Sequence, residues 1–178
     1  MKKQSVKPQG REKIEHKKSF SAGALVFSIV GKEPRVLMLL QNSAYYAQKY
    51  GRSGTEEVVD IGPKGQIMKG ESPIAAASRE IREEIGIRLH MDTGFTEEES
   101  FTMLSKDPKT RKPVQVERKV TYFLAFLHHN DIKRIQLSEE HVKYYLLPMR
   151  EAMAKTRFAD RKAILQRAFD YVREVYVT

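Results

Sequence analysis

Cysteine is absent from this sequence of 178 residues, and glycine (10) and proline (7) are few. The lack of cysteine excludes disulfides and thiolate chemistry, and nothing argues for an oxidising compartment, so we expect a cytoplasmic protein. Hydrophobic residues make up 40% and charged residues 31% of the chain, which excludes collagen-like and disordered classes. No apolar run approaches the roughly 18 residues of a membrane helix. The sequence therefore predicts one globular domain without a membrane segment.

Positive charge is in excess and is unevenly distributed. The chain has 32 Lys and Arg against 23 Asp and Glu, a net charge of +9, which suggests an anionic partner such as a nucleotide, a nucleic acid or an acidic membrane. Residues 1–18 contain seven basic and two acidic residues, so they contribute +5 and the rest of the chain only +4. We interpret residues 1–18 as a flexible basic arm that serves either solubility or RNA contact, and residues 19–178 as the single domain.

Short apolar segments bounded by turn residues predict several strands. Residues 22–30 and 35–40 are rich in Val, Leu, Ile and Phe and flank the turn signal of residues 31–34, so we expect a β-hairpin. Further strands are expected at residues 58–61, 87–89, 101–104, 114–127 and 141–147. Residues 41–57 are polar but contain three tyrosines, which predicts either a long loop or a short helix followed by a loop.

The pattern becomes helical after residue 72. Ser72 suits the N-cap, Pro73 suits the first helical position, and Gly86 suits a left-handed helix end. Apolar residues at helical spacing form a stripe between them: Ile74, Ala77, Ile81 and Ile85. We expect a helix over this segment, a short helix at residues 149–154 and an amphipathic helix at residues 158–176. Mixed strands and helices predict an α/β or α+β sandwich.

Three acidic residues share one face of the best-defined helix. Glu80, Glu83 and Glu84 stand at i, i+3 and i+4, and Glu71 adds a fourth acid before the helix. Such a face is either solvated or a cation site, because like charges crowd each other unless a cation lies between them. Hard oxygen ligands suit Mg²⁺ or Mn²⁺. The preceding turn offers Lys64 and backbone N–H groups for phosphate oxygens, which suits a phosphate substrate.

These residues carry a resemblance. Gly65, Glu71 and residues 79–87 match the Nudix box at every defined position, so the chain resembles the Nudix hydrolase family. The resemblance implies an α/β/α sandwich around a mixed sheet, and metal-dependent hydrolysis of a nucleoside diphosphate linked to another moiety. It also implies that Arg79 pairs with Glu71 and holds the loop against the helix, which is structural support of the site.

The same resemblance assigns roles to the acidic face. Glu80, Glu83 and Glu84 would be the metal ligands, together with the main-chain carbonyl of Gly65. The general base is not at a fixed position in this family, and Glu83 and a distal glutamate are both candidates. Among the ligands, Glu83 and Glu84 are also candidate catalytic residues.

Outside the box, residues 21–172 resemble the dinucleoside tetraphosphate (Ap4A) hydrolase branch. The matching segments are residues 22–27, 62–65, 119–125 and 137–144. The resemblance implies that Glu140 is the distal catalytic acid near the metals, that Tyr144 stacks on adenine, and that His141 lies close to the phosphates. From the residues alone, Tyr144 is equally a packing aromatic and His141 a structural histidine, and Lys119 either contacts polyphosphate or decorates a strand edge. The tryptophan that often precedes the turn in this branch is replaced by residues 59–61.

Three functions remain open from the sequence. The first is hydrolysis of a dinucleoside polyphosphate such as Ap4A by attack of water on phosphorus. The second keeps this chemistry but acts on a 5′-triphosphate or capped RNA or another nucleotide derivative, and the basic arm favours it. The third is a nucleotide- or RNA-binding domain without turnover.

Overall fold

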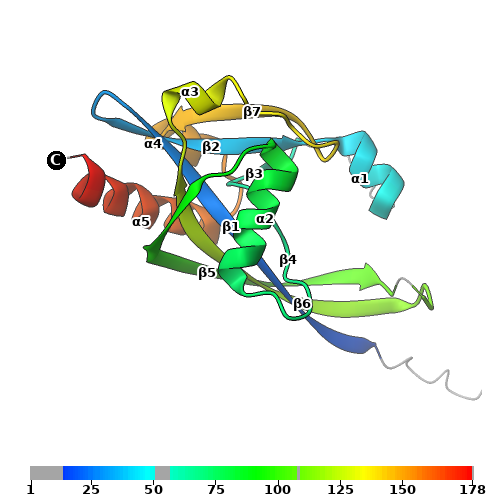
Figure 1. Cartoon of the computed structure of the whole chain (residues 1–178). Helices are drawn as coiled ribbons and strands as arrows, with labels where there is room; N and C mark the ends of the chain where they lie inside the picture. The colour runs from blue at the N-terminus through cyan, green and yellow to red at the C-terminus, as the bar shows by residue number, and fades with distance from the viewer. Residues whose placement is uncertain (1–13, 51–56, 108, 178) are drawn as a thin grey trace, which may run out of the picture.

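A computed structural model describes residues 14–50, 57–107 and 109–177 (Figure 1). Its strands are β1 (Glu15–Val30), β2 (Glu33–Gln41), β3 (Val59–Asp60), β4 (Lys64–Gln66), β5 (His90–Lys106), β6 (Pro113–Phe126) and β7 (His141–Pro148). Its helices are α1 (Ser43–Tyr50), α2 (Pro73–Ile85), α3 (His129–Ile132), α4 (Met149–Lys155) and α5 (Ala159–Tyr176).

The strands form one mixed sheet. The main order is β3-β2-β1-β6-β5, with β4 paired to β1 and β7 paired to β2. β1 and β6 are parallel along their length, whereas β1–β2, β1–β4, β2–β3, β2–β7 and β5–β6 are antiparallel. The β1–β2 hairpin and the mixed sheet were both expected from the sequence, and both are confirmed.

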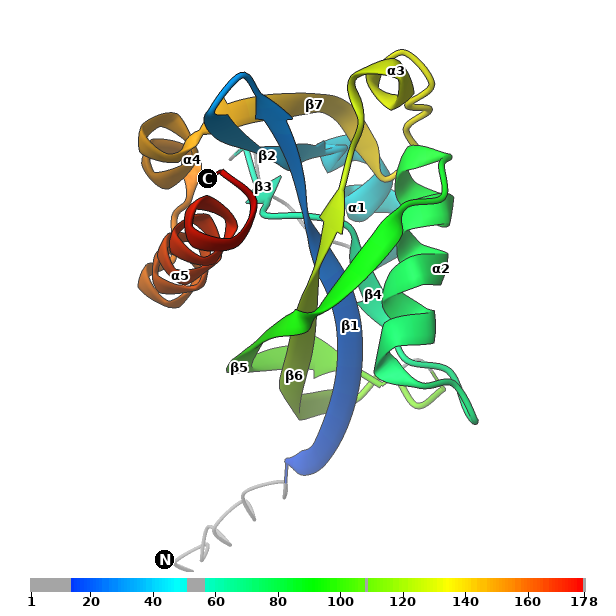
Figure 2. The same ribbon diagram turned by 60° about the vertical axis from the view of Figure 1, so that its left-hand side comes forward.

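Helices cover both faces of this sheet (Figure 2). Because side chains alternate along a strand, Leu25 and Phe27 of β1 face α5, whereas Ala24 and Val26 face α2. Phe27 meets Phe169 of α5 edge-on at 4.9 Å between ring centroids, in the apolar cluster between the sheet and α5. Each fully buried side chain of this size contributes about 1.5–3 kcal/mol. The α/β sandwich is therefore confirmed.

Several strand boundaries differ from the sequence prediction, most of all between residues 87 and 106. Residues 87–89 do not form a strand; Ile87 is buried in the cluster beneath α2, so its apolar character reflects packing of a connection. β5 begins at His90 and extends through the polar stretch to Lys106. This strand lies at the sheet edge with β6 as its partner, and an edge strand with exposed residues gives only a weak alternation signal.

The structure describes part of the predicted basic arm and part of the polar segment 41–57. Residues 15–18, the last part of the predicted arm, belong to β1 and pair with β6, and the Lys17 ammonium binds Asp107. Residues 1–13 of that arm lie outside the described residues. In the polar segment 41–57, the helix alternative is observed as α1. No helix in the described part of the chain is long and apolar enough to cross a membrane.

Candidate functional site

Helix α2 starts and ends where its sequence dictates. The Ser72 hydroxyl accepts a hydrogen bond from the backbone of Ala75 at 3.3 Å, and Gly86 ends the helix in the left-handed region at φ 76°. Ile81 and Ile85 are buried against the sheet. This orientation leaves the acidic face directed at the turn between β3 and β4.

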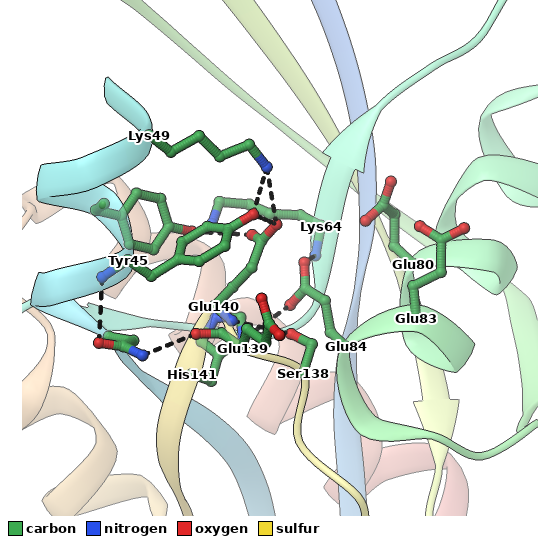
Figure 3. A network of polar contacts seen from close by, with 12 residues as sticks. Tyr45, Lys49, Lys64, Glu80, Glu83, Glu84, Ser138, Glu139, Glu140 and His141 are labelled. Atoms are coloured by element: carbon green, nitrogen blue, oxygen red, sulfur yellow. Dashed lines mark hydrogen bonds and ion pairs between the residues drawn. The ribbon is translucent and has the colours of Figure 1, made fainter. Parts of the chain in front are cut away.

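The turn and the helix meet at two buried acids (Figure 3). Glu80 is 8% exposed and Glu84 is 6% exposed, whereas the side chain of Glu83 is 51% exposed. The backbone N–H of Lys64 donates to Glu84 Oε1 at 3.2 Å. A Cβ atom on Gly65 would lie 2.1 Å from Glu80 Oε1, so only glycine leaves room for this carboxylate against the turn.

Arg79 joins the loop to the helix. Its Nε and Nη2 atoms donate to the two oxygens of Glu71 at 2.9 and 3.1 Å, and Nη2 also donates to the carbonyl of Gln66 at 2.9 Å. The guanidinium, with the backbone N–H of Met68, holds the pKa of Glu71 below its ordinary value. These contacts fix the loop that precedes α2 against the helix.

The same guanidinium also stands between two of the acids. Arg79 Nη1 donates to Glu80 Oε1 at 2.5 Å and to Glu83 Oε2 at 3.0 Å. Burial raises the pKa of Glu80, and raises that of Glu84 to about 9, because both carboxylates lack water and crowd each other. In the described part of the chain, no three acidic or histidine side chains already converge on one point for an ion. The site nevertheless fits a hard divalent cation, because it offers carboxylate oxygens as donors. Gly65 leaves room for the Glu80 carboxylate, and the Arg79 guanidinium already binds Glu80 and Glu83 as a positive group.

A buried acid that the sequence analysis did not single out lies behind the turn. Asp60 of β3 is 2% exposed. Its Oδ1 binds the Lys64 ammonium at 2.5 Å, and its Oδ2 accepts from the Gln41 side-chain amide at 2.7 Å. Burial alone would raise the pKa of Asp60, but Lys64, His141 and Gln41 together hold it below its ordinary value. The Lys64 ammonium is thus directed to Asp60.

His141 links this buried acid to the helix. Its side chain is 1% exposed, with Nδ1 3.7 Å from Glu84 Oε2 and Nε2 3.7 Å from Asp60 Oδ2. Both distances exceed a direct hydrogen bond, and neither nitrogen has a hydrogen-bond partner among the residues that the structure describes. The imidazole is therefore enclosed between two carboxylates within the protein.

The polar network continues through the sheet to α5. Arg161 Nη1 lies 3.9 Å from Asp60 Oδ1, and Arg161 Nε donates to Glu99 Oε1 at 2.8 Å. The Tyr122 hydroxyl donates to Glu99 Oε2 at 3.3 Å. Sequence reasoning missed these residues, although two signals were available: Asp60 interrupts an apolar run, and Arg161 lies on the apolar stripe of the terminal helix.

The remaining sequence candidates are more dispersed. Glu140 precedes β7 and accepts hydrogen bonds from Tyr45 and Tyr46 of α1 at 3.0 and 3.2 Å. Tyr144 is half-buried against the apolar cluster beneath α2. The Lys119 ammonium pairs with Glu98 of the adjacent strand at 2.8 Å. The structure thus gathers Glu140 and His141 near α2 and gives Lys119 a partner on β5.

Sequence comparison decides the family. The sequence model of the NUDIX domain matches residues 19–168. The chain belongs to the NUDIX domain family. This Nudix protein is 35% identical to the asymmetrical bis(5′-nucleosyl)-tetraphosphatase of Sus scrofa over 113 residues, which cover 62% of the chain and 69% of that relative. The corresponding Mus musculus protein is 34% identical over the same length.

Solved structures agree with this assignment. The Nudix chain is similar to an Ap4A hydrolase binary complex from C. elegans, with a TM-score of 0.67 and 22% identity over 88% of this chain and 98% of that one. It is also similar to the E. coli dihydroneopterin triphosphate pyrophosphohydrolase, with a TM-score of 0.58 and 22% identity over 89% and 99% of the two chains. At this identity the structures show a common fold. The family and its curated relatives identify the protein as a hydrolase acting on pyrophosphate bonds, and Nudix hydrolases generally use divalent metals.

Proposed function

We propose that this Nudix hydrolase depends on a divalent metal, Mg²⁺ with Mn²⁺ as a substitute, and cleaves dinucleoside polyphosphates such as Ap4A by attack of water on phosphorus. The observation that carries the proposal is the meeting of buried Glu80 and Glu84 with the backbone of residues 64–65. The 35% identity to an asymmetrical bis(5′-nucleosyl)-tetraphosphatase supports the substrate class.

Ion binding, support of the loop and base stacking fall to different residues. Glu80, Glu83 and Glu84 would hold the ion, which neutralises charge on a pyrophosphate and makes nearby water more acidic. Arg79 keeps the loop in place through Glu71. Its Nη1 atom, which binds Glu80 and Glu83 in the structure, would move away from these acids when they hold the ion. Tyr144, which is half-buried, is the candidate for stacking on a nucleobase, a contact that contributes about 1–3 kcal/mol per base.

Incubation of the protein with Ap4A and Mg²⁺ tests the proposal. We expect ATP and AMP as products, loss of activity after chelation, and recovery on addition of Mg²⁺ or Mn²⁺. Glu84→Gln should lose about 100-fold or more in kcat. The matched control is Glu117→Gln, because Glu117 is a surface acid paired with Lys18 at 3.8 Å; this variant should keep the kcat of the wild type. Absence of ATP and AMP would overturn the substrate proposal, and activity in chelator would overturn metal dependence.

A second substrate class is favoured by charge. Residues 1–13 contain five basic residues, which suits contact with a 5′-triphosphate or capped RNA. Deletion of residues 1–13 leaves β1 complete, since β1 begins at Glu15. If RNA is the substrate, this deletion should raise KM for RNA steeply and change turnover of small nucleotides little. Equal effects on both substrates would argue against RNA contact.

A further inference from the structure

Helix α1 is attached to the chain segment that carries Glu140. The backbone N–H of Asn42 donates to the carbonyl of Glu140 at 2.7 Å, and its side-chain amide donates to the carbonyl of Glu139 at 2.9 Å. Asn42 Oδ1 accepts from the backbone N–H of Tyr45 at 3.3 Å. One residue therefore both starts α1 and ties it to the strand entrance.

Two tyrosines of α1 then bind the carboxylate itself, of which Figure 3 labels Tyr45 beside Glu140. The Tyr45 hydroxyl donates to Glu140 Oε1 at 3.0 Å, and the Tyr46 hydroxyl donates to Glu140 Oε2 at 3.2 Å. Because each hydroxyl binds a different oxygen, the pair fixes both the position and the rotation of the carboxylate. The Lys49 ammonium lies 3.6 Å from Oε1 and adds a positive charge on the same side.

The half-buried environment of Tyr46 keeps its hydroxyl a hydrogen-bond donor. Burial, followed by the negative charges of Asp60, Glu140 and Glu84, raises the pKa of Tyr46 far above its ordinary value. The hydroxyl therefore stays protonated near neutral pH. Its ring meets the Tyr45 ring edge-on at 5.5 Å, so the two tyrosines also support each other.

The segment before Glu140 is anchored to α2 from the other side. The backbone N–H of Ser138 donates to the carbonyl of Glu84 at 3.0 Å, and that of Gln136 donates to the carbonyl of Ile85 at 3.0 Å. The backbone carrying Glu140 is thereby fixed to the same helix end that carries Glu84. The side chain of Glu140 is 32% exposed, so its orientation depends on the α1 contacts.

We propose that Tyr45 and Tyr46 are positioning residues of this hydrolase, which hold the Glu140 carboxylate in register with the acids of α2. The proposal deepens the proposed function and rests on it, because it needs Glu140 to act as the distal catalytic acid near the metal. The contribution of α1 is geometric: the hydroxyls act through Glu140 and do not bind the substrate.

The test compares Tyr45→Phe, Tyr46→Phe and the double variant with the wild type under saturating Mg²⁺. Each single variant should lower kcat roughly tenfold, in the range usual for groups that orient an active-site ligand, with KM within twofold of wild type. The matched control is Tyr176→Phe on the far helix α5. The Tyr176 hydroxyl donates to the Asp92 carboxylate of β5 at 2.8 Å, so this variant also loses a tyrosine–carboxylate hydrogen bond, but its kcat should not change. Melting temperatures verify that each variant is folded.

The decisive measurement repeats the substitutions in a Glu140→Gln background. If the hydroxyls act through Glu140, the tyrosine substitutions should cause no further loss there. An equal loss in both backgrounds, or a raised KM with unchanged kcat, would overturn the positioning role. Full activity of Glu140→Gln would overturn it too, while hydrolysis of Ap4A by the wild type would leave the proposed function standing. If another nucleotide is the substrate, the same variants are compared on that nucleotide, so a wrong substrate is distinguished from a wrong role of α1.

Discussion

Substitution of Gly65 by alanine tests the metal site with one methyl group. The backbone of Gly65 does not require a left-handed conformation, so alanine is compatible with the main chain. Its Cβ atom, however, would lie 2.1 Å from Oε1, 2.2 Å from Cδ and 2.4 Å from Oε2 of Glu80. All three atoms of the carboxyl group would therefore have to move.

The size of the movement follows from these distances. An ordinary contact of Cβ begins at 3.4 Å, so the carboxyl group must shift by more than about 1 Å. The group is the far end of a flexible side chain, which makes the shift cheap for the fold. A misplacement of about 1 Å at a reacting centre costs on the order of 100-fold in rate. We therefore expect Gly65→Ala to fold normally, to lose about 100-fold in kcat and to need more Mg²⁺ for half-maximal activity.

The assay is a magnesium titration of nucleotide hydrolysis, with the melting temperature as a check of folding. Gly94→Ala is the matched control, because its Cβ would lie 2.6 Å from the Tyr171 hydroxyl, another movable side-chain end, beside α5. This control should keep wild-type activity. A Gly65→Ala enzyme with wild-type kcat and magnesium requirement would refute the assignment of Glu80 to the site.

Three further predictions concern the buried charges. Divalent metal should raise the melting temperature by relieving the crowding of the acids; an unchanged melting temperature at millimolar Mg²⁺ would contradict a preformed site. Because burial raises the pKa of Glu84 to about 9 from 4.5, the metal-free protein should lose stability as pH rises through this window. Differential scanning calorimetry of the metal-free proteins should then find that the melting temperature of Glu84→Gln rises relative to that of the wild type from pH 5 to pH 8. A constant difference between the two melting temperatures would show that the pKa of Glu84 is not raised into this range. Lys64→Met removes the ammonium that binds Asp60 Oδ1 and leaves this buried carboxylate only the Gln41 amide and the more distant Arg161 guanidinium. Removal of one partner of a buried ion pair costs about 3–5 kcal/mol, so the melting temperature should fall by about 10 °C, whereas that of Lys119→Met, at an exposed pair, should not differ from wild type.

The sequence predicted best what depends on neighbouring residues. The boundaries of α2 follow from Ser72, Pro73 and Gly86, which act within one turn of the helix. The three glutamates share a face because helical geometry alone places them there. The predicted strand at residues 87–89 was wrong, since a short apolar segment looks the same whether it pairs in a sheet or packs beneath a helix.

The sequence did not predict the contacts that join distant segments. Asp60, Glu99 and Arg161 come from β3, β5 and α5, and no local pattern pairs them. Tyr45 and Glu140 are 95 residues apart in the chain. The sequence shows tyrosines in residues 41–57, but the contacts that Tyr45 and Tyr46 make with Glu140 exist only in the folded chain.

Lys64 takes part both in the local turn and in a buried contact behind it. Its backbone N–H belongs to the turn that faces Glu84, whereas its ammonium compensates Asp60 in the interior. A phosphate that took this ammonium would leave Asp60 with only the Gln41 amide and the more distant Arg161 guanidinium, and a buried charge that loses its ion-pair partner costs several kcal/mol. Exposed lysines have no such cost. The lysine that the turn motif offers to phosphate thus has a buried partner in the fold, and we expect a phosphate contact of its ammonium to cost more than the same contact of an exposed lysine.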